Sequence, residues 1–282
     1  MNYQLCETLE AMRAYRQSLN GKVAVVPTMG ALHEGHLSLV KEARKYADTV
    51  ILTIFVNPTQ FGPHEDFEKY PRDLEGDLRK GQSAGVDCFF TPTKVMMYPP
   101  NYGTYVVPEL PLEQKLEGAF RPGHFRGVTT IVLKLFNIIQ PHAALFGLKD
   151  YQQYLLIKKM VEDLNCPIQV VGVPIYRESD GLAMSSRNVY LSQTERQQAL
   201  VLSKAIQQAK IALLEKGERD LTLLEQQLRK KIEVSSEIQI DYACFVDPET
   251  LDPQSHFTGK TLFILTVRIG KTRLLDNAVI QK

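Results

Sequence analysis

Two histidines three residues apart form the part of this sequence best suited to chemistry. His33 and His36 lie in the run KVAVVPTMGALHEGHLSLV (22–40), after a short apolar stretch and the turn residues PTMG. The apolar residues 23–26 predict a buried strand, and the residues from Ala31 onward predict a helix. The N-terminus of a helix offers unpaired N–H groups and about half a positive charge, so it can bind phosphate. Two imidazoles on the same helix face would add donors for phosphate oxygens.

Two simpler interpretations of this pair stay open. The zinc-binding helix motif spaces its histidines four residues apart, whereas His33 and His36 are three apart with no cysteine or third histidine nearby. Two unrelated surface histidines would also give this spacing. We favour the binding of nucleotide phosphate.

A second group of anion-binding residues lies far along the chain, in GLAMSSRN (181–188). Ser185, Ser186 and Arg187 supply two hydroxyls and a guanidinium within three residues. Such a segment can wrap a triphosphate and stabilise a phosphorus transition state, because the guanidinium carries the charge and the hydroxyls donate hydrogen bonds. Without the histidine pair, the same residues would be read as an ordinary helix cap.

Three further segments follow predicted strands or precede helices. FVNPTQFGP (55–63) carries Asn57 and Gln60, whose amides can orient a hydroxy acid, although an ordinary polar loop has the same composition. FGLKDYQQ (146–153) places Lys149, a point charge for phosphate, at a strand-to-helix turn, with Gln153 one turn into the helix. RPGHFRGV (121–128) enters an apolar helix through two arginines and a histidine, which suits an anion, a mobile flap or simple capping.

Acidic residues offer one candidate for a metal ligand. Asp73 and Asp77 lie four apart on a probable helix, and Mg²⁺ needs only one or two carboxylates when phosphate oxygens complete its shell. A solvated helix face explains the same pair, so both interpretations stay open.

The elements that must position these residues alternate between strand and helix over the first 175 residues. This alternation predicts a mostly parallel sheet covered on both faces, with ligands at the carboxyl ends of the strands. The expected strands are 23–26, 50–56, 86–91, 143–146 and 168–173, and the expected helices are 3–19, 36–47, 73–84, 126–139 and 151–163.

The character of the chain changes near residue 190. Ser192 and Glu195 predict a capping box, followed by a helix to about Leu214, a break at Gly217 and a second helix to about Ile232. Strands are expected at 240–246, 261–269 and, briefly, 273–276. We therefore predict an α/β protein in two domains. They are a domain with a mostly parallel sheet over 1–175 and a smaller α+β domain over 176–282.

Composition excludes several classes of protein. The 282 residues include 33 basic and 32 acidic side chains, so there is no electrostatic case for nucleic-acid binding. The sequence has no run of 18 apolar residues and no signal-like N-terminus, which argues against a membrane span or export. Its four cysteines are widely spaced without any CxxC, as expected for free thiols in the cytoplasm.

Taken in order, the five motifs PTMGALHEGH, FVNPTQFGP, RPGHFRGV, FGLKDYQQ and GLAMSSRN resemble the pantothenate synthetase (pantoate–β-alanine ligase) family. This family is part of the nucleotidylyltransferase and class I aminoacyl-tRNA synthetase superfamily. The similarity is strong over residues 20–190. The resemblance implies that the domain over 1–175 is a Rossmann-like domain that binds ATP and pantoate, and that the domain over 176–282 is a lid. It implies a homodimer formed through the N-terminal domain, ATP and Mg²⁺ as substrate and cofactor, and a pantoyl adenylate that β-alanine converts to pantothenate.

The resemblance also assigns roles residue by residue. His36 is implied as the proton donor, and His33, Lys149 and Arg187 would join it in stabilising charge on the phosphate. Asn57, Gln60 and Gln153 are expected at pantoate, Gln60 also at β-alanine, and Asp77 at Mg²⁺; Arg121, His124 and Arg126 receive no role. The residues implied in ATP binding are Met29, Gly30, Ala31, Leu32, His33, Glu34, Gly35, His36, Gly147, Leu148, Lys149, Asp150, Tyr176, Met184, Ser185, Ser186 and Arg187.

Two positions depart from the family pattern. Tyr176 stands where a small aliphatic residue is usual, and Leu148 replaces a polar side chain of GEKD or GQKD, which leaves Lys149 in place. Three rival functions stay open: another nucleotidylyl-transferring enzyme of the superfamily, a tRNA-charging enzyme, and a non-enzymatic metal or phosphate binder. Near-neutral charge and a short C-terminal domain argue against the second.

Overall fold

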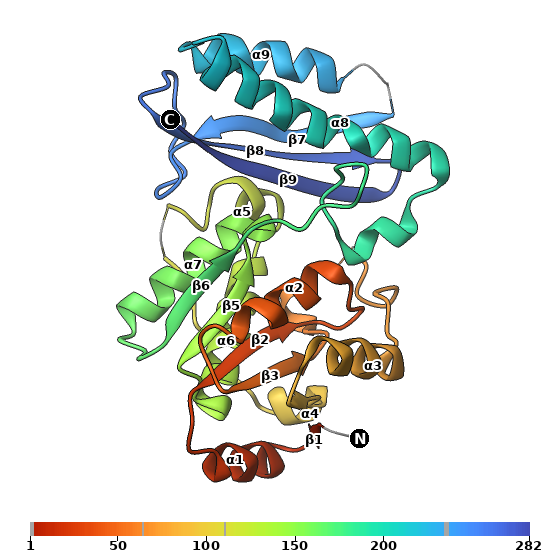
Figure 1. Cartoon of the computed structure of the whole chain (residues 1–282), viewed down its shortest axis with the longest axis vertical. Helices are drawn as coiled ribbons and strands as arrows, with labels where there is room; N and C mark the ends of the chain where they lie inside the picture. Colours follow the sequence, from red (N-terminus) through yellow and green to blue (C-terminus); the bar gives the residue numbers. More distant parts are fainter. Residues whose placement is uncertain (1–2, 64, 110, 234–236) are drawn as a thin grey trace. The chain divides into compact units, whose positions relative to one another are not determined.

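The computed structural model describes all residues except 1–2, 64, 110 and 234–236, and it divides the chain into two compact units. The first unit covers Met1–Pro174 and the second covers Ile175–Lys282. This division falls one residue before the predicted one. None of the helices in the described ranges combines the length and apolarity that a membrane span requires. Figure 1 shows the elements of each unit.

The first unit is built on a six-stranded sheet whose paired strands are all parallel. Its order is β1-β4-β3-β2-β5-β6. The parallel α/β architecture predicted from the sequence is therefore confirmed. The strands are β1 (Gln4–Cys6), β2 (Val23–Thr28), β3 (Thr49–Ile54), β4 (Cys88–Phe90), β5 (Ala143–Gly147) and β6 (Gln169–Val173).

Helices cover both faces of this sheet, because successive residues of a strand point to opposite sides. Val23 and Val25 of β2 pack in the cluster that contains the helices α1, α6 and α7, whereas Ala24 and Val26 pack with α2 and α3. The helices of the unit are α1 (Leu9–Ser18), α2 (Glu34–Ala43), α3 (Leu74–Ala84), α4 (Lys94–Met97), α5 (Leu116–Phe120), α6 (His124–Ile139) and α7 (Tyr151–Asp163), with short 3-10 turns η1 (Pro58–Gln60) and η2 (Leu148–Asp150).

The N-terminal prediction of one helix over 3–19 is wrong in its first part. Residues Gln4–Cys6 form the edge strand β1, which pairs with β4, and α1 begins only after Thr8. The Thr8 side chain accepts a hydrogen bond from the Ala11 N–H and so caps the helix. Pairing with a distant strand overrides the local helical pattern here.

The second unit places two long helices on one face of a three-stranded antiparallel sheet, ordered β7-β8-β9. The predicted capping box is confirmed, because Ser192 and Glu195 exchange their hydrogen bonds at the start of α8. The last strand was predicted as a short one and instead spans ten residues. The elements are η3 (Ser186–Tyr190), α8 (Gln193–Lys210), the π-helical turn η4 (Ile211–Glu215), α9 (Leu221–Ile232), β7 (Ile238–Val246), β8 (Lys260–Ile269) and β9 (Thr272–Gln281).

Candidate active site

The candidate site of the first unit lies where the strand order of its sheet reverses. The chain runs from β2 outward through β3 to β4, then returns to place β5 on the other side of β2. The segments that follow β2 and β5 therefore flank a topological switch point at the carboxyl edge of the sheet. Ligands of open α/β sheets bind at such a point. The HEGH and GLKD motifs are the segments that begin there.

The loop between β2 and α2 is sharply turned. Gly30 and Ala31 both have positive φ, +80° and +51°, and Thr28 Oγ1 accepts the Gly30 N–H. The next N–H groups, of Ala31 and Leu32, donate to the two carboxylate oxygens of Asp77 at 2.8 and 2.7 Å. Successive main-chain N–H groups in such a turn form an anion-binding nest. Here the nest holds a carboxylate of the protein itself.

Asp77 is thus a buried brace for the loop and is not part of a solvated helix face. Its side chain is 1% exposed and projects from α3, and Lys80 of the same helix donates to the Leu32 carbonyl at 2.9 Å. Burial raises the pKa of Asp77 despite the opposing hydrogen bonds from Leu32 and Ala31. Both oxygens already accept main-chain N–H groups, and the role of Asp77 as a Mg²⁺ ligand stays a prediction.

His33 and His36 lie together, although not as two residues within one helix. His33 is the N-cap of α2, with extended backbone, and His36 is the third helical residue. Their rings stack with centroids 4.0 Å apart. Burial lowers the pKa of His36 well below 6.5, and the charges of His33, Lys149 and Lys80 lower it further. His36 is therefore neutral at pH 7.

The buried Nδ1 of His36 has no hydrogen-bond partner among the described residues. Buried polar atoms in proteins are almost always paired, so an unpaired one needs an explanation. A ligand oxygen or N–H at this position would satisfy it. Lys149 lies close enough for its charge to lower the pKa of His36. The GLKD turn is therefore near the imidazoles.

The GLKD turn continues directly into α7. Lys149 retains 20% side-chain exposure, and its Nζ lies 4.0 Å from the carboxylate of Asp150. Gln153, in the first turn of α7, is half-buried, and its side chain makes no hydrogen bond within the described ranges. By contrast, its neighbour Gln152 is buried and donates to the carbonyls of Leu112 and Lys115. Gln153 is thus the glutamine of this pair that is available to a ligand.

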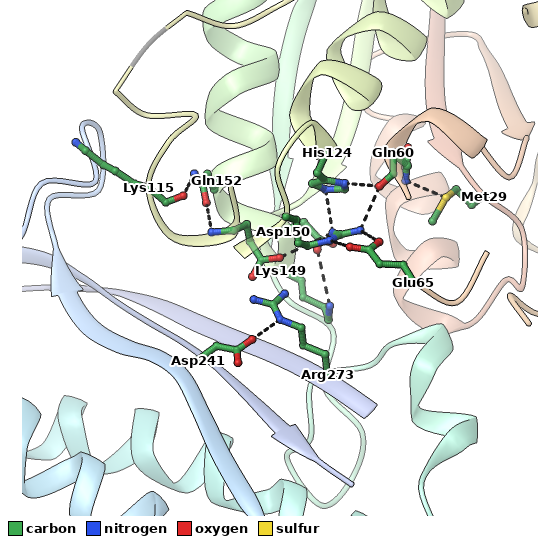
Figure 2. Close-up of polar contacts among 12 residues, drawn as sticks. Met29, Gln60, Glu65, Lys115, His124, Lys149, Asp150, Gln152, Asp241 and Arg273 are labelled. Carbon is green, nitrogen blue, oxygen red and sulfur yellow. Dashed lines mark hydrogen bonds and ion pairs between the residues drawn. The ribbon is translucent and has the colours of Figure 1, made fainter. Parts of the chain in front are cut away.

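The loop after β3 brings Gln60 to the same edge. The Gln60 amide donates to Met29 Sδ at 2.9 Å (Figure 2). Its Oε1 accepts from the Asn57 amide at 3.1 Å. Asn57 itself is 1% exposed. Its Oδ1 accepts from Thr59 and from the Tyr98 hydroxyl, and its amide also donates to the Gly127 carbonyl. The Asn57 side chain thus orients Gln60 in this structure, and its predicted contact with substrate stays a prediction.

The SSRN segment belongs to the second unit, where several side chains hold it in place. Ser185 caps η3 by accepting the Arg187 N–H at 3.3 Å, and Asn188 donates to Glu178 and to the Ala183 carbonyl. Ser185, Ser186 and Arg187 are all half-buried. Tyr176 is 42% exposed, and its carbonyl accepts the Met184 N–H at 3.0 Å. Ser185 therefore does cap a short helical turn, as the alternative interpretation had it, and the binding of triphosphate by this segment stays a prediction.

Comparison with known proteins gives the family of the chain. A sequence profile described as pantoate-beta-alanine ligase matches residues 4–279. The chain belongs to the pantoate–β-alanine ligase family. This confirms the resemblance drawn from the five motifs.

Relatives of this family align over nearly the whole chain. A pantothenate synthetase of Heliobacterium modesticaldum is 53% identical over 281 residues, covering 99% of each sequence. A crystal structure of pantothenate synthetase from Thermus thermophilus superposes with a TM-score of 0.93 at 44% identity, covering 98% of both chains. The pantoate–β-alanine ligase of Francisella tularensis was crystallised with a β-γ ATP compound and β-alanine. It has a TM-score of 0.82 and 34% identity, and covers 98% of this chain and 97% of its own.

The zinc interpretation of the histidine pair gains no support in this family member. In the part of the chain that the structure describes, no three His, Cys, Asp or Glu side chains gather as a metal site would require. The stacked imidazoles also share their surroundings with two lysines, and positive charge opposes a cation.

Sequence reasoning left one group of residues in this family member without a role. Arg121 and His124 contact the Gln60 carbonyl, and Glu65 binds the Arg121 guanidinium. Arg126, from the same motif, is exposed and lies over the Tyr105 ring. The local sequence separates them: Arg121 and His124 flank a Pro-Gly turn, with His124 as the first residue of α6, whereas Arg126 is the third residue of that helix.

Proposed function

We propose that this chain joins pantoate to β-alanine in an ATP-dependent reaction that passes through a pantoyl adenylate and releases AMP and pyrophosphate. One observation carries the proposal in a chain of this family. His33, His36 and Lys149 converge at the switch point between β2 and β5, where the buried Nδ1 of His36 has no hydrogen-bond partner among the residues that the structure describes. The Francisella tularensis structure, named for its β-γ ATP and β-alanine, supports the same pair of substrates.

The first half-reaction needs alignment more than covalent catalysis. The pantoate carboxylate attacks the α-phosphorus of ATP, forming the acyl–phosphate bond as the bond to pyrophosphate breaks. Negative charge builds on the phosphate oxygens, and fixed donors stabilise it. His36 and His33 supply imidazole N–H donors, and Lys149 supplies a positive charge. Arg187, with Ser185 and Ser186, would add the remaining contacts to the triphosphate.

Pantoate would lie against the loop after β3. Hydrogen bonds to Asn57 and Met29 orient the Gln60 side-chain amide. Gln60 is half-buried, as a group that contacts a hydroxy acid must be. Gln153 would contact pantoate from the first turn of α7. In the second half-reaction the β-alanine amine attacks the acyl carbon, AMP leaves, and the amide bond forms. Gln60 would help to place that amine.

Magnesium would enter as the MgATP complex, the substrate form of the nucleotide. Its usual shell in such complexes consists of phosphate oxygens and water with few protein carboxylates. The carboxylate of Asp77 is buried and already holds two main-chain N–H groups, which supports a loop-bracing role more strongly than direct coordination.

The wider organisation follows from the family resemblance. We infer that residues 176–282 act as a lid that keeps water from the adenylate, a reactive mixed anhydride. We also infer a homodimer through the N-terminal domain and a cytoplasmic location, with no nucleic-acid or membrane partner.

The direct test incubates the protein with ATP, Mg²⁺, pantoate and β-alanine and measures AMP and pantothenate. We expect both products in equal amounts, and pyrophosphate exchange into ATP that requires pantoate but not β-alanine. Exchange with a different acid in place of pantoate would indicate another adenylate-forming enzyme. Tight metal retention without turnover would indicate a binding protein and would overturn the proposal.

A further inference from the structure

The main chain of Gln60 is held from one side by the N-terminus of α6. His124, the first residue of α6, contacts the Gln60 carbonyl through Nδ1 at 2.8 Å (Figure 2). The Arg121 guanidinium donates to the same carbonyl at 3.3 Å. Both contacts span more than sixty residues of sequence. The segment RPGHFRG therefore positions a residue of the loop after β3.

These contacts allow one protonation state of His124. A carbonyl oxygen can only accept, so Nδ1 must carry the proton that it donates to Gln60. The guanidinium can only donate, so Nε2, which lies 3.0 Å from Arg121 Nη1, must be unprotonated. The ring is therefore a neutral imidazole with its proton on Nδ1. Its 8% exposure removes water as an alternative partner for most of the ring.

Glu65 holds the arginine in place. Its two carboxylate oxygens accept from Arg121 Nε and Nη2 at 2.7 and 2.6 Å, a bidentate pair of the kind that fixes a guanidinium plane. Burial alone would raise the pKa of Glu65, but the hydrogen bonds and charge of Arg121 outweigh it and lower that pKa. Glu65 is thus ionised at neutral pH. Glu65, Arg121 and His124 form a chain of contacts that ends on the Gln60 carbonyl, and we call these three residues the Gln60 clamp.

The close approach that the clamp requires is visible at Gly127. A methyl group at this position would lie 2.3 Å from the Thr59 carbonyl oxygen and 2.7 Å from the Gln60 nitrogen. Only glycine allows α6 to pack so tightly on η1. At the same point the Gly127 carbonyl accepts from the Asn57 amide, which also donates to Gln60 Oε1. Contacts therefore fix both the main chain of Gln60 and its side-chain amide.

We propose that the Gln60 clamp is a positioning device for the acid substrate, which sets the place of the Gln60 amide without touching the ligand. The proposal rests on the proposed function, in which Gln60 binds pantoate. The contacts from His124 and Arg121 both end on the Gln60 carbonyl, in the loop after β3, whereas the imidazoles and Lys149 follow β2 and β5. Loss of the clamp should therefore weaken pantoate binding and leave ATP binding nearly unchanged.

The test compares His124→Phe with His124→Asn in steady-state kinetics of the full-length protein. Phenylalanine fills the site but removes the donor to the Gln60 carbonyl, and asparagine restores a donor near the position of Nδ1. We expect the KM for pantoate to rise about tenfold or more in His124→Phe, the size of one lost hydrogen bond, with the KM for ATP within about twofold of wild type. His124→Asn should recover most of the loss.

The matched control is His142→Phe. His142 belongs to the same unit and its Nδ1 also contacts main chain, accepting the Val23 N–H at 2.9 Å, but it lies at the opposite, amino edge of the sheet. Its substitution should leave the KM for pantoate unchanged. If His124→Phe does not fold, Glu65→Gln answers the same question, because it keeps the packing and removes the charge that holds Arg121.

The outcomes separate this proposal from the proposed function. Equal increases in the KM values for pantoate and ATP, or no change in either, would overturn the positioning role. A wild-type protein with no pantoate-dependent pyrophosphate exchange would overturn the proposed function instead. A selective rise for pantoate in His124→Phe that asparagine reverses supports the clamp.

Discussion

The imidazole rings of His33 and His36 lie nearly parallel, with centroids 4.0 Å apart and planes inclined by 28°. Two charged imidazolium rings at this distance would repel each other strongly, so the arrangement favours a neutral His36. The lowered pKa of His36, caused first by burial and then by the positive charges of His33 and Lys149, agrees with this. The pair can therefore offer hydrogen-bond donors without the cost of two adjacent charges, as the proposed contact with phosphate requires.

Replacing His36 by alanine should lower the rate of adenylate formation by about 10²-fold, the usual effect of removing one donor that acts in the transition state. The measurement is pantoate-dependent exchange of pyrophosphate into ATP. The exposed His256 of the second unit provides a surface control, since His256→Ala should leave the exchange unchanged. An unaltered exchange rate in His36→Ala would show that the ring does not act on the phosphate.

Replacing Asp77 by asparagine should loosen the loop that carries the histidines. The two carboxylate oxygens accept one N–H group each, from Ala31 and Leu32, whereas asparagine has a single acceptor oxygen. One of these hydrogen bonds is therefore lost, and a buried N–H left unpaired costs about 1–3 kcal/mol. We expect a lower midpoint of thermal unfolding and a higher KM for ATP.

The control for Asp77 is Asp73→Ala at the start of the same helix, because alanine removes the capping oxygen that asparagine would keep. Asp73 caps α3 by accepting the Gly76 N–H, so its loss should reduce stability without raising the KM for ATP. The dependence on Mg²⁺ then separates the two roles of Asp77. A higher half-saturating Mg²⁺ concentration in Asp77→Asn, with unchanged thermal stability, would favour metal coordination over loop bracing.

The sequence predicts the parallel sheet and most of its helices because the apolar patterns of β2, β3 and α7 are long and regular. The α7 prediction over 151–163 matches the structure at both ends. The edge strand β1 could not be predicted from its own residues, since three residues of strand are stable only through their pairing with β4. The length of β9 was missed because Asp276 and Asn277 interrupt the apolar alternation, yet both are buried.

The candidate site was predicted more completely in its motifs than in its internal contacts. The convergence of HEGH and GLKD follows from strand order, which a regular βα pattern makes predictable. Asp77 braces the loop after β2 through a contact that spans 45 residues of sequence. The residues around Asp77 show only an acidic side chain on a helix, so this contact could not be predicted from them. The same holds for His124, whose role appears only when α6 is packed against η1.

In the second unit, loss of the Arg177 side chain should be strongly destabilising. Its guanidinium donates to both oxygens of Asp276 at 2.7 and 2.8 Å, and the Asp276 carboxylate is fully buried. Removing one partner of a buried pair leaves an uncompensated charge, which costs about 3–5 kcal/mol. Urea unfolding of Arg177→Ala measures this. The double variant with Asp276→Asn should regain part of the loss, and a double variant less stable than the single one would contradict the account.

The free energy of unfolding in weak acid should depend on His124, because its ring is neutral in the folded protein. Burial, followed by the charge of Arg121, lowers the pKa of His124 to about 4, against 6.5 for an ordinary histidine, although the Gln60 carbonyl, Glu117 and Glu65 oppose this. Between these two pH values the unfolded chain binds a proton that the folded chain does not. The free energy of unfolding is therefore unaffected by His124 above pH 6.5 and falls as the pH drops toward 4.

The expected loss over this window is about 3 kcal/mol, from a difference of roughly 2.5 pKa units at about 1.36 kcal/mol each. Carboxylates that titrate in the same range also contribute, so the measurement is the difference between wild type and His124→Asn, which has no group to protonate there. Denaturant unfolding at about pH 7, 6, 5 and 4 should give a shallower decline in the variant. Parallel curves for the two proteins would mean that His124 accepts a proton in the folded state, and the hydrogen bond from Nδ1 to the Gln60 carbonyl would then not require a neutral ring.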